Sequence, residues 1–140
     1  MAKGKVGLGR RGETLAADAL HQRGFEMVTR NWHCPEGEVD LVARKAEEWY
    51  FFEVRTRRGT GYGSPEESVG ERKLARMEEV ARRYLGEEVT ALDAMWHLGL
   101  VAVLMDRRGR LQRITIYPDV NGPPLPPLPS SKPSEPRRAR

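Results

Sequence analysis

The sequence predicts an α/β fold with the element order αβββαββ. Two stretches with apolar residues at spacings of three and four predict helices, and five stretches rich in β-prone residues predict strands. With 140 residues, of which 39% are hydrophobic and 31% charged, the chain can bury one real core and is short for two. We therefore expect one globular α/β domain.

Each predicted helix ends where a glycine follows an apolar stripe. The first helix is predicted over residues 10–24, because Leu15, Ala16 and Leu20 share a stripe and Gly24 takes the usual C-terminal position. The second helix is predicted over residues 70–86. Its stripe consists of Leu74, Met77, Ala81, Tyr84 and Leu85.

The strands are bounded by turn signals. They are predicted within residues 25–32, 37–44, 49–58, 95–105 and 110–117. The run MWHLGLVAVLM is apolar throughout, as expected for a central strand. DRRG then predicts a turn into an outer strand with polar and apolar residues in alternation.

Two carboxylates interrupt the predicted hairpin GEVDLVARKAEEWYFFEVRTRR. An antiparallel register that pairs Arg44 with Trp49 across a four-residue loop sets Asp40 opposite Glu53. Like charges about 5 Å apart repel by roughly 3 kcal/mol at an effective dielectric near 20. A divalent cation between the two carboxylates would remove this repulsion, and Mg²⁺ prefers such oxygen ligands. We therefore expect a metal site at these two acids.

Period-two alternation gives this hairpin one apolar face and one face that carries the acids. The apolar face is expected to hold Val39, Leu41, Tyr50, Phe52 and Val54, and the acid face Glu38, Asp40, Val42, Phe51, Glu53 and Arg55. A third acid, Glu13, shares a helical face with Ala16 and Leu20 and should point toward the strands. The helix macrodipole explains a first-turn Glu equally well, so spacing alone leaves the role of Glu13 open.

Several blocks of the chain resemble a known family. GRRGETLAADAL, RNW, GEVDLVA, FFEVRTRR and SVGERK resemble the YraN family of bacterial proteins, which are predicted nucleases. An acid followed on the next strand by E-x-K, here Asp40 and then Glu53 to Arg55, is similar to the PD-(D/E)XK superfamily of restriction enzymes and archaeal Holliday-junction resolvases. The resemblance covers residues 9–103 and implies a restriction-endonuclease-like fold, a mixed β-sheet flanked by helices.

The resemblance also implies a chemistry. It places a divalent metal, Mg²⁺ or Mn²⁺, among Glu13, Asp40, Glu53 and the carbonyl of Val54, and it implies hydrolysis of phosphodiester bonds in DNA. Branched and single-stranded DNA are candidate substrates. Arg55 stands where the superfamily usually has Lys, and a guanidinium is effectively never deprotonated, so Arg55 cannot be a general base. It can still hold the scissile phosphate. Asp40, Glu53 and Arg55 are therefore the predicted catalytic residues.

Other basic residues are expected to contact the nucleic-acid backbone. Arg57 and Arg58 extend the phosphate-facing edge of the third strand, and Arg10 and Arg11 precede the first helical stripe. Lys73 matches a lysine of the family and could bind phosphate or replace the missing strand lysine. A merely solvated position on the helix is the open alternative for Lys73.

Some residues receive no role. Cys34 has no partner for a disulfide or a zinc site, and an isolated His97 on a strand is usually structural. Gly99 stands where relatives often have Asp. GLGRRG, residues 7–12, fits G-x-G-x-x-G, but no predicted strand precedes it, so it does not indicate a dinucleotide site.

The last part of the chain differs in composition. Residues 118–140 hold eight of the ten prolines and carry a net charge of +2, half of the formal +4 of the chain. We predict a disordered basic tail after a globular domain of residues 1–117. Together with Arg55, this tail leaves an alternative open, a non-catalytic nucleic-acid-binding or scaffold protein on the same fold.

The expected setting is the cytoplasm. No stretch approaches the roughly 20 apolar residues of a membrane span, and no apolar signal region follows the basic N-terminus. The expected partner is nucleic acid, most simply DNA, and not a membrane. The likeness to resolvases adds a homodimer as a candidate assembly.

Overall fold

The computed structural model describes residues 2–59, 61, 63–89 and 94–128, with side chains from residue 7 onward. Its elements follow the predicted order αβββαββ, with one short 3₁₀ helix added. They are α1 (Ala2–Gln22), β1 (Glu26–Cys34), β2 (Gly37–Lys45), β3 (Glu48–Arg58), η1 (Glu66–Ser68), α2 (Glu71–Glu88), β4 (Trp96–Met105) and β5 (Leu111–Tyr117). The predicted fold class is confirmed.

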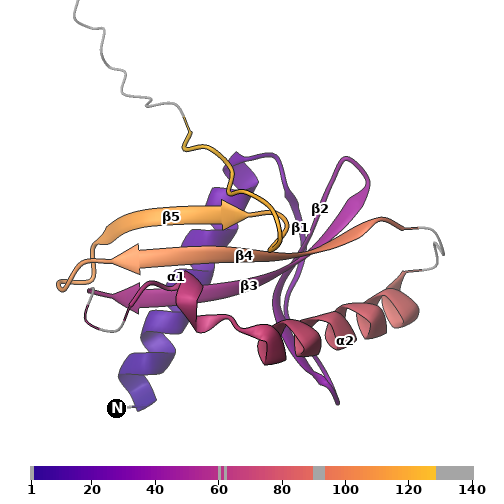
Figure 1. Cartoon of the computed structure of the whole chain (residues 1–140), viewed down its shortest axis with the longest axis horizontal. Coiled ribbons are helices and arrows are strands. Elements are labelled where there is room, and N and C mark those ends of the chain that lie inside the picture. Colours follow the sequence, from indigo (N-terminus) through magenta and orange to yellow (C-terminus); the bar gives the residue numbers. More distant parts are fainter. Residues whose placement is uncertain (1, 60, 62, 90–93, 129–140) are drawn as a thin grey trace, which may run out of the picture.

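The strands form one mixed sheet in the order β1-β2-β3-β4-β5. β3 and β4 run parallel, and the other neighbours are antiparallel. α2 lies in the crossover between β3 and β4, as a parallel pair requires. Figure 1 shows α1 on one face of the sheet and α2 on the other, so the domain has three layers.

The face under α1 contains the larger core. Ala16 and Leu20 of α1 are fully buried and pack against Leu41, Phe52 and Val101 of the sheet. The small side chain of Ala16 lets α1 approach the strands closely.

The face under α2 is also buried. Val80 and Tyr84 of α2 pack against Val39, Val42 and Phe51. The expectation of one apolar and one chemical face is therefore wrong, because the crossover helix covers the second face. Strict alternation fails as well, since Val39 packs with Val42 and not with the apolar face predicted for it.

The register of the β2–β3 hairpin is as predicted. Arg44 pairs with Trp49, and Leu41 pairs with Phe52. This pairing keeps Leu41 and Phe52 on the α1 face, where both are fully buried.

The loop of this hairpin is shorter than predicted. Lys45 and Glu48 also pair, so the turn consists of Ala46 and Glu47 alone, with φ of 52° and 66°. Positive φ at both positions is type I′ geometry, whose twist matches that of the strands. The two-residue turn was not predicted, because neither Ala46 nor Glu47 is one of the residues, Asn or Gly, that usually indicate it.

The helices differ from the prediction at their ends. α1 begins at Ala2, so residues 7–12 are helical and form no glycine-rich phosphate loop. Its C-terminus is closed as predicted, with Gly24 at φ 89°. α2 ends at Glu88, beyond the predicted Gly86. Neither of these described helices combines the length and apolarity needed to cross a bilayer.

The chain continues along the domain past the predicted boundary at residue 117. Within residues 118–128, the backbone N–H of Leu125 donates to the carbonyl of Ile116 at 2.8 Å, and Leu125 packs against the core under α1. Packing in this segment therefore extends beyond the predicted domain end. The rest of the predicted tail, residues 129–140, lies outside the described residues.

Candidate metal and nucleic-acid site

The β2–β3 ladder ends one residue before the two acids. Its last pair is Leu41 with Phe52, next to Asp40 and Glu53. Beyond this point β2 stays with β1, while β3 stays with β4 as far as Arg58. In Figure 1, β1 and β2 run steeply across the direction of β3. The acids lie where the hairpin opens, and not opposed within a closed ladder as the sequence suggested.

A backbone irregularity accompanies this opening. In the β1–β2 ladder, Arg30 pairs with Leu41 and Trp32 with Val39. Asn31, the residue between these partners on β1, has φ 54°. Left-handed backbone is uncommon outside glycine but is most accessible to Asn and Asp. The irregularity lies across from Asp40, where the alternation of β2 fails.

Asp40 fills the space between the separating strands. Its Oδ2 accepts a hydrogen bond from the backbone N–H of Val54 at 2.8 Å, in place of a ladder bond. The residue is 9% exposed. Within the part of the chain that the structure describes, no basic side chain forms an ion pair with Asp40.

These surroundings change the acidity of Asp40. Burial and then the charge of Glu53 raise the pKa of Asp40 to about 7, and the charges of Glu13 and Glu38 act in the same direction. The hydrogen bond from Val54 opposes them, because it favours the ionised form. Asp40 is therefore a buried acid that is only partly ionised at neutral pH.

Glu53, in contrast to Asp40, has two basic side chains beside it. Its Oε2 lies 3.0 Å from Nε of Arg55, and its Oε1 lies 3.4 Å from Nζ of Lys73. Arg55 Nε makes no aligned hydrogen bond to a described residue, so the first contact is an ion pair only. Lys73 comes from the first turn of α2, and the structure thus brings this predicted residue to the acids.

Glu13 reaches the site because α1 packs closely on β3. A Cβ at Gly12 would lie 3.1 Å from Cβ of Thr56 and would collide with its hydroxyl. A β-branched side chain has little freedom to move away. Gly12 therefore permits the close approach that carries Glu13 to the same cleft as Asp40.

This cleft has a volume of about 570 Å³, and its lining includes acidic residues as well as arginines. Among its lining residues are Glu13, Asp40, Val54, Arg55, Arg57 and Arg58. Gly9, one helical turn before Glu13, also lines it. The helical period could have identified Gly9, but the predicted helix began only at residue 10.

The oxygens around the cleft suit a hard divalent cation. Carboxylates are supplied by Glu13 and Asp40, and the carbonyl of Val54 lies on the same side of β3 as the N–H that binds Asp40. Such donors suit Mg²⁺ or Mn²⁺. Glu53 would join them by exchanging a basic partner for the ion.

Metal ligation by these residues stays a prediction. Among the side chains that the structure describes, no three from His, Cys, Asp and Glu are gathered closely enough to be recognised as ligands of one ion. The structure brings Glu13, Glu53 and the backbone of Val54 around Asp40, each within electrostatic or hydrogen-bonding reach.

The remaining predicted nucleic-acid-binding residues lie on two elements. Arg57 and Arg58 are at the end of β3, and Nε of Arg57 is buried without a described hydrogen-bond partner. Arg10 and Arg11 are exposed on α1.

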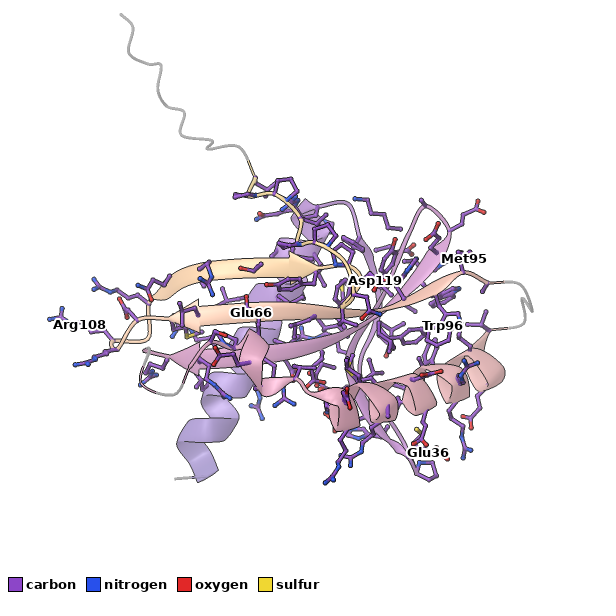
Figure 2. All side chains as sticks on the ribbon, viewed as in Figure 1. Glu36, Glu66, Met95, Trp96, Arg108 and Asp119 are labelled. Atoms are coloured by element: carbon purple, nitrogen blue, oxygen red, sulfur yellow. The ribbon has the colours of Figure 1, made fainter. Side chains whose placement is uncertain are left out.

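Two residues that were given no role, His97 and Gly99, have close contacts within the fold. His97 lies between two acids, with Nε2 2.6 Å from Glu48 Oε1 and Nδ1 3.5 Å from Asp119 Oδ2; Figure 2 labels Asp119. A Cβ at Gly99 would lie 2.6 Å from the ring of Phe52. The packing of that ring accounts for glycine at this position.

Comparison with known proteins gives a match over most of the chain. Residues 12–115 match the uncharacterised protein family UPF0102. A UPF0102 protein of Beutenbergia cavernae is 42% identical over 107 residues, which cover 76% of this chain and 90% of that protein. One from Nocardia farcinica is 44% identical over 104 residues, covering 72% and 79%, and one from Moorella thermoacetica is 40% identical over 108 residues, covering 77% and 89%. The family match includes all four predicted metal ligands, whereas Arg10 and Arg11 lie outside it.

Proposed function

This chain belongs to the uncharacterised protein family UPF0102, and we propose that it is a divalent-metal-dependent nuclease that hydrolyses phosphodiester bonds in DNA. The family match agrees with the resemblance to YraN proteins, while the PD-(D/E)XK superfamily is part of the proposal. The proposal rests above all on Asp40, a buried carboxylate at an arginine-lined cleft that has no described basic partner. Perturbed acids of this kind are concentrated at functional sites.

The acids and one backbone carbonyl at the cleft are the proposed metal ligands. Asp40 and Glu53 anchor the metal, with Glu13 and the carbonyl of Val54 completing the protein's share of its ligands. A bound Mg²⁺ or Mn²⁺ would polarise the phosphate and lower the pKa of a water molecule.

Arg55 and Lys73 are the proposed phosphate ligands next to the metal. Both form ion pairs with Glu53, so a phosphate bound beside Glu53 would be a second anion within their reach. Arg55 can bind it through two parallel hydrogen bonds, whereas Lys73 acts as a compact charge.

DNA is the proposed substrate because the cleft continues into basic surface. Arg57 and Arg58 follow Arg55 along β3, and Arg10 and Arg11 are exposed on α1. Contacts from such residues neutralise phosphates and make binding strongly salt-dependent. The cytoplasm is the proposed setting and a homodimer the proposed assembly, the latter testable by light scattering.

Metal titration tests the site directly. Mg²⁺ and Mn²⁺ would be titrated by calorimetry into the wild type, Asp40→Asn, Glu53→Gln and the control Glu78→Gln. Glu78 is an exposed acid of α2 that pairs with Arg82. We expect binding by the wild type and the control and weakened binding by both site variants. Unchanged binding by Asp40→Asn and Glu53→Gln would remove the proposed site.

A panel of labelled DNAs tests the activity. Single strands, duplexes, flaps and four-way junctions would be incubated with Mg²⁺, Mn²⁺ or EDTA. We expect the wild type to cleave at least one of these DNAs in the presence of metal. We expect no cleavage in EDTA and no cleavage by Asp40→Asn. The substrate that is cut would also identify the DNA shape.

A second candidate is a non-catalytic nucleic-acid-binding or scaffold protein. It is favoured by Arg55 in place of lysine and by Glu53, which already has two basic partners. This candidate expects salt-dependent DNA binding that persists in EDTA, with no cleavage of any DNA in the panel.

A further inference from the structure

Two arginines from distant parts of the chain converge on one glycine. Gly109 lies in the turn between β4 and β5, is buried, and has φ 82°. The position of a Cβ on Gly109 would be 3.4 Å from Nη1 of Arg11 on α1 and 3.2 Å from Nη2 of Arg58 at the end of β3. The absence of a side chain thus lets both guanidinium groups lie over the same point.

No described carboxylate compensates this pair of positive charges. Neither Arg11 nor Arg58 forms an ion pair with an acid of the described residues. Asp106, the acid of the same turn, is otherwise engaged. Its Oδ1 accepts from the backbone N–H groups of Arg108 and Arg110 at 2.9 and 2.8 Å, and its Oδ2 accepts from Nε of Arg110 at 2.8 Å.

These hydrogen bonds hold the charge of Asp106 inside its own turn. The backbone N–H of Arg110 contributes most to lowering the pKa of Asp106, so its carboxylate is ionised, and its hydrogen bonds go to Arg108 and Arg110. Two neighbouring guanidinium groups without an acid form a receptor for an oxyanion, and their planar forks match the geometry of a phosphate.

The pair is continuous with the cleft of Asp40. Arg58 lines that cleft, and β3 connects it to Val54, the residue bonded to Asp40. Four residues of a strand span about 13 Å. The basic pair and the acids therefore belong to one track along β3.

We propose that Arg11 and Arg58 together bind one internal backbone phosphate of a DNA strand, about 13 Å along β3 from Asp40. This inference rests on the proposed function, since it assumes that DNA occupies the cleft. It adds the direction of the strand, from the acids toward the β4–β5 turn. At about 3.4 Å of rise per nucleotide, the shared phosphate lies about four nucleotides from the cleaved bond in B-form DNA, and fewer if the strand is stretched.

A double-mutant cycle tests whether the phosphate is shared. DNA binding would be measured by fluorescence anisotropy in EDTA for the wild type, Arg11→Ala, Arg58→Ala and the double variant. Arg108→Ala is the matched control, because Arg108 belongs to the same turn and Figure 2 shows it at the outer tip. Circular dichroism would check that each variant is folded.

We expect each single variant to lose about tenfold in affinity and the double variant to lose little more, because both residues serve one phosphate. The slope of log affinity against log salt should become shallower by about one in the variants. The control should change by less than about twofold. Additive losses, an equal loss in Arg108→Ala, or no loss at all would overturn the inference.

Oligonucleotides with and without a terminal phosphate distinguish an internal phosphate from a chain end. In a series of oligonucleotide lengths, Arg58→Ala should weaken binding only of strands long enough to reach from the acids to the β4–β5 turn. This should hold with and without a terminal phosphate. An effect that requires the terminal phosphate would overturn the internal assignment. Because binding is measured without metal, these results stand apart from whether the protein cleaves DNA.

Discussion

The two ends of the β2–β3 hairpin differ in strand pairing and in the kind of side chain that they bury. At the turn end the strands stay paired from Lys45 and Glu48 to Leu41 and Phe52. At the other end the ladder stops and β2 leaves β3. Phe52, the last residue of β3 that pairs with β2, is fully buried, and the next residue along that strand is an acid.

The difference shows how one hairpin can combine a stable apolar core with a candidate site. The closed end holds apolar side chains, including Phe25 and Phe52 with ring centroids 5.5 Å apart in an edge-to-face arrangement. The open end buries Asp40 without a described basic partner, which costs free energy. Local destabilisation of this kind is expected where a site is prepared to receive a ligand.

Removing the central ring of the closed end should have the largest effect. Phe52→Ala should lower the free energy of unfolding by about 3–5 kcal/mol, because Phe52 is fully buried against Phe25 and Leu41 is its ladder partner. Urea unfolding followed by circular dichroism measures this. A loss below about 1 kcal/mol would mean that the closed end does not stabilise the domain as described.

Removing the charge of Asp40, at the open end, should instead raise the free energy of unfolding. Burial and Glu53 raise the pKa of Asp40 from 3.8 to about 7, so the folded state holds this proton more tightly than the unfolded state. The resulting stability is fully present below pH 3.8 and is lost as the pH rises through about 7. Asp40→Asn should therefore stabilise the protein at pH 8 by up to about 4 kcal/mol.

The pH dependence provides the control for this variant. Near pH 3.5 Asp40 is largely protonated in both states, so the stabilisation by Asn should fall to about 0.2 kcal/mol there. Unfolding midpoints at pH 3.5, 6 and 8 distinguish the cases. A destabilisation of similar size at every pH would show that Asp40 acts through its hydrogen bond to Val54 and not through its charge.

Metal should stabilise the open end only when its acids are intact. At a free Mg²⁺ concentration one hundred times Kd, binding to the folded state alone adds about 2.7 kcal/mol to the free energy of unfolding. Thermal unfolding with and without Mg²⁺ should show this for the wild type and for Glu78→Gln, but not for Asp40→Asn. Equal shifts in all three proteins would place the bound ion elsewhere.

The smallest expected effect concerns the turn. Glu47 has φ 66°, a conformation that glycine adopts without steric cost. Glu47→Gly should stabilise the hairpin by about 0.5–1 kcal/mol, because relief of the strain exceeds the entropy that glycine loses. Urea unfolding measures the change. A destabilised variant would mean that the side chain of Glu47 contributes more than its backbone conformation costs.

Much of the fold could be predicted from periodicity and turn signals. The order αβββαββ and the pairing of Arg44 with Trp49 are confirmed, because local patterns and the apolar face constrain the register. The extent of α1 could not be predicted in this way. Its first turns are poor in apolar residues, and glycines at positions 7 and 9 weaken the helical signal.

The candidate site was only partly accessible to sequence reasoning. Asp40 and Glu53 were identified together, but the register gave no sign that the ladder would stop beside them. The difference between the acids depends on where α2 places Lys73 and on the turn of β2 away from β3. Such contacts join residues far apart in the chain, and no local pattern encodes them.

By itself, the sequence determined the kinds of element, their order, the hairpin register and the residues with suitable chemistry, because each of these follows from local periodicity and side-chain type. Only the tertiary structure decided that both faces of the sheet are buried and that Asp40 lies without a described basic partner while Glu53 has two. It alone also brought Arg11 and Arg58 together over Gly109. The physical reason is that burial and charge pairing depend on the distances between elements, which are fixed only when the helices pack on the sheet.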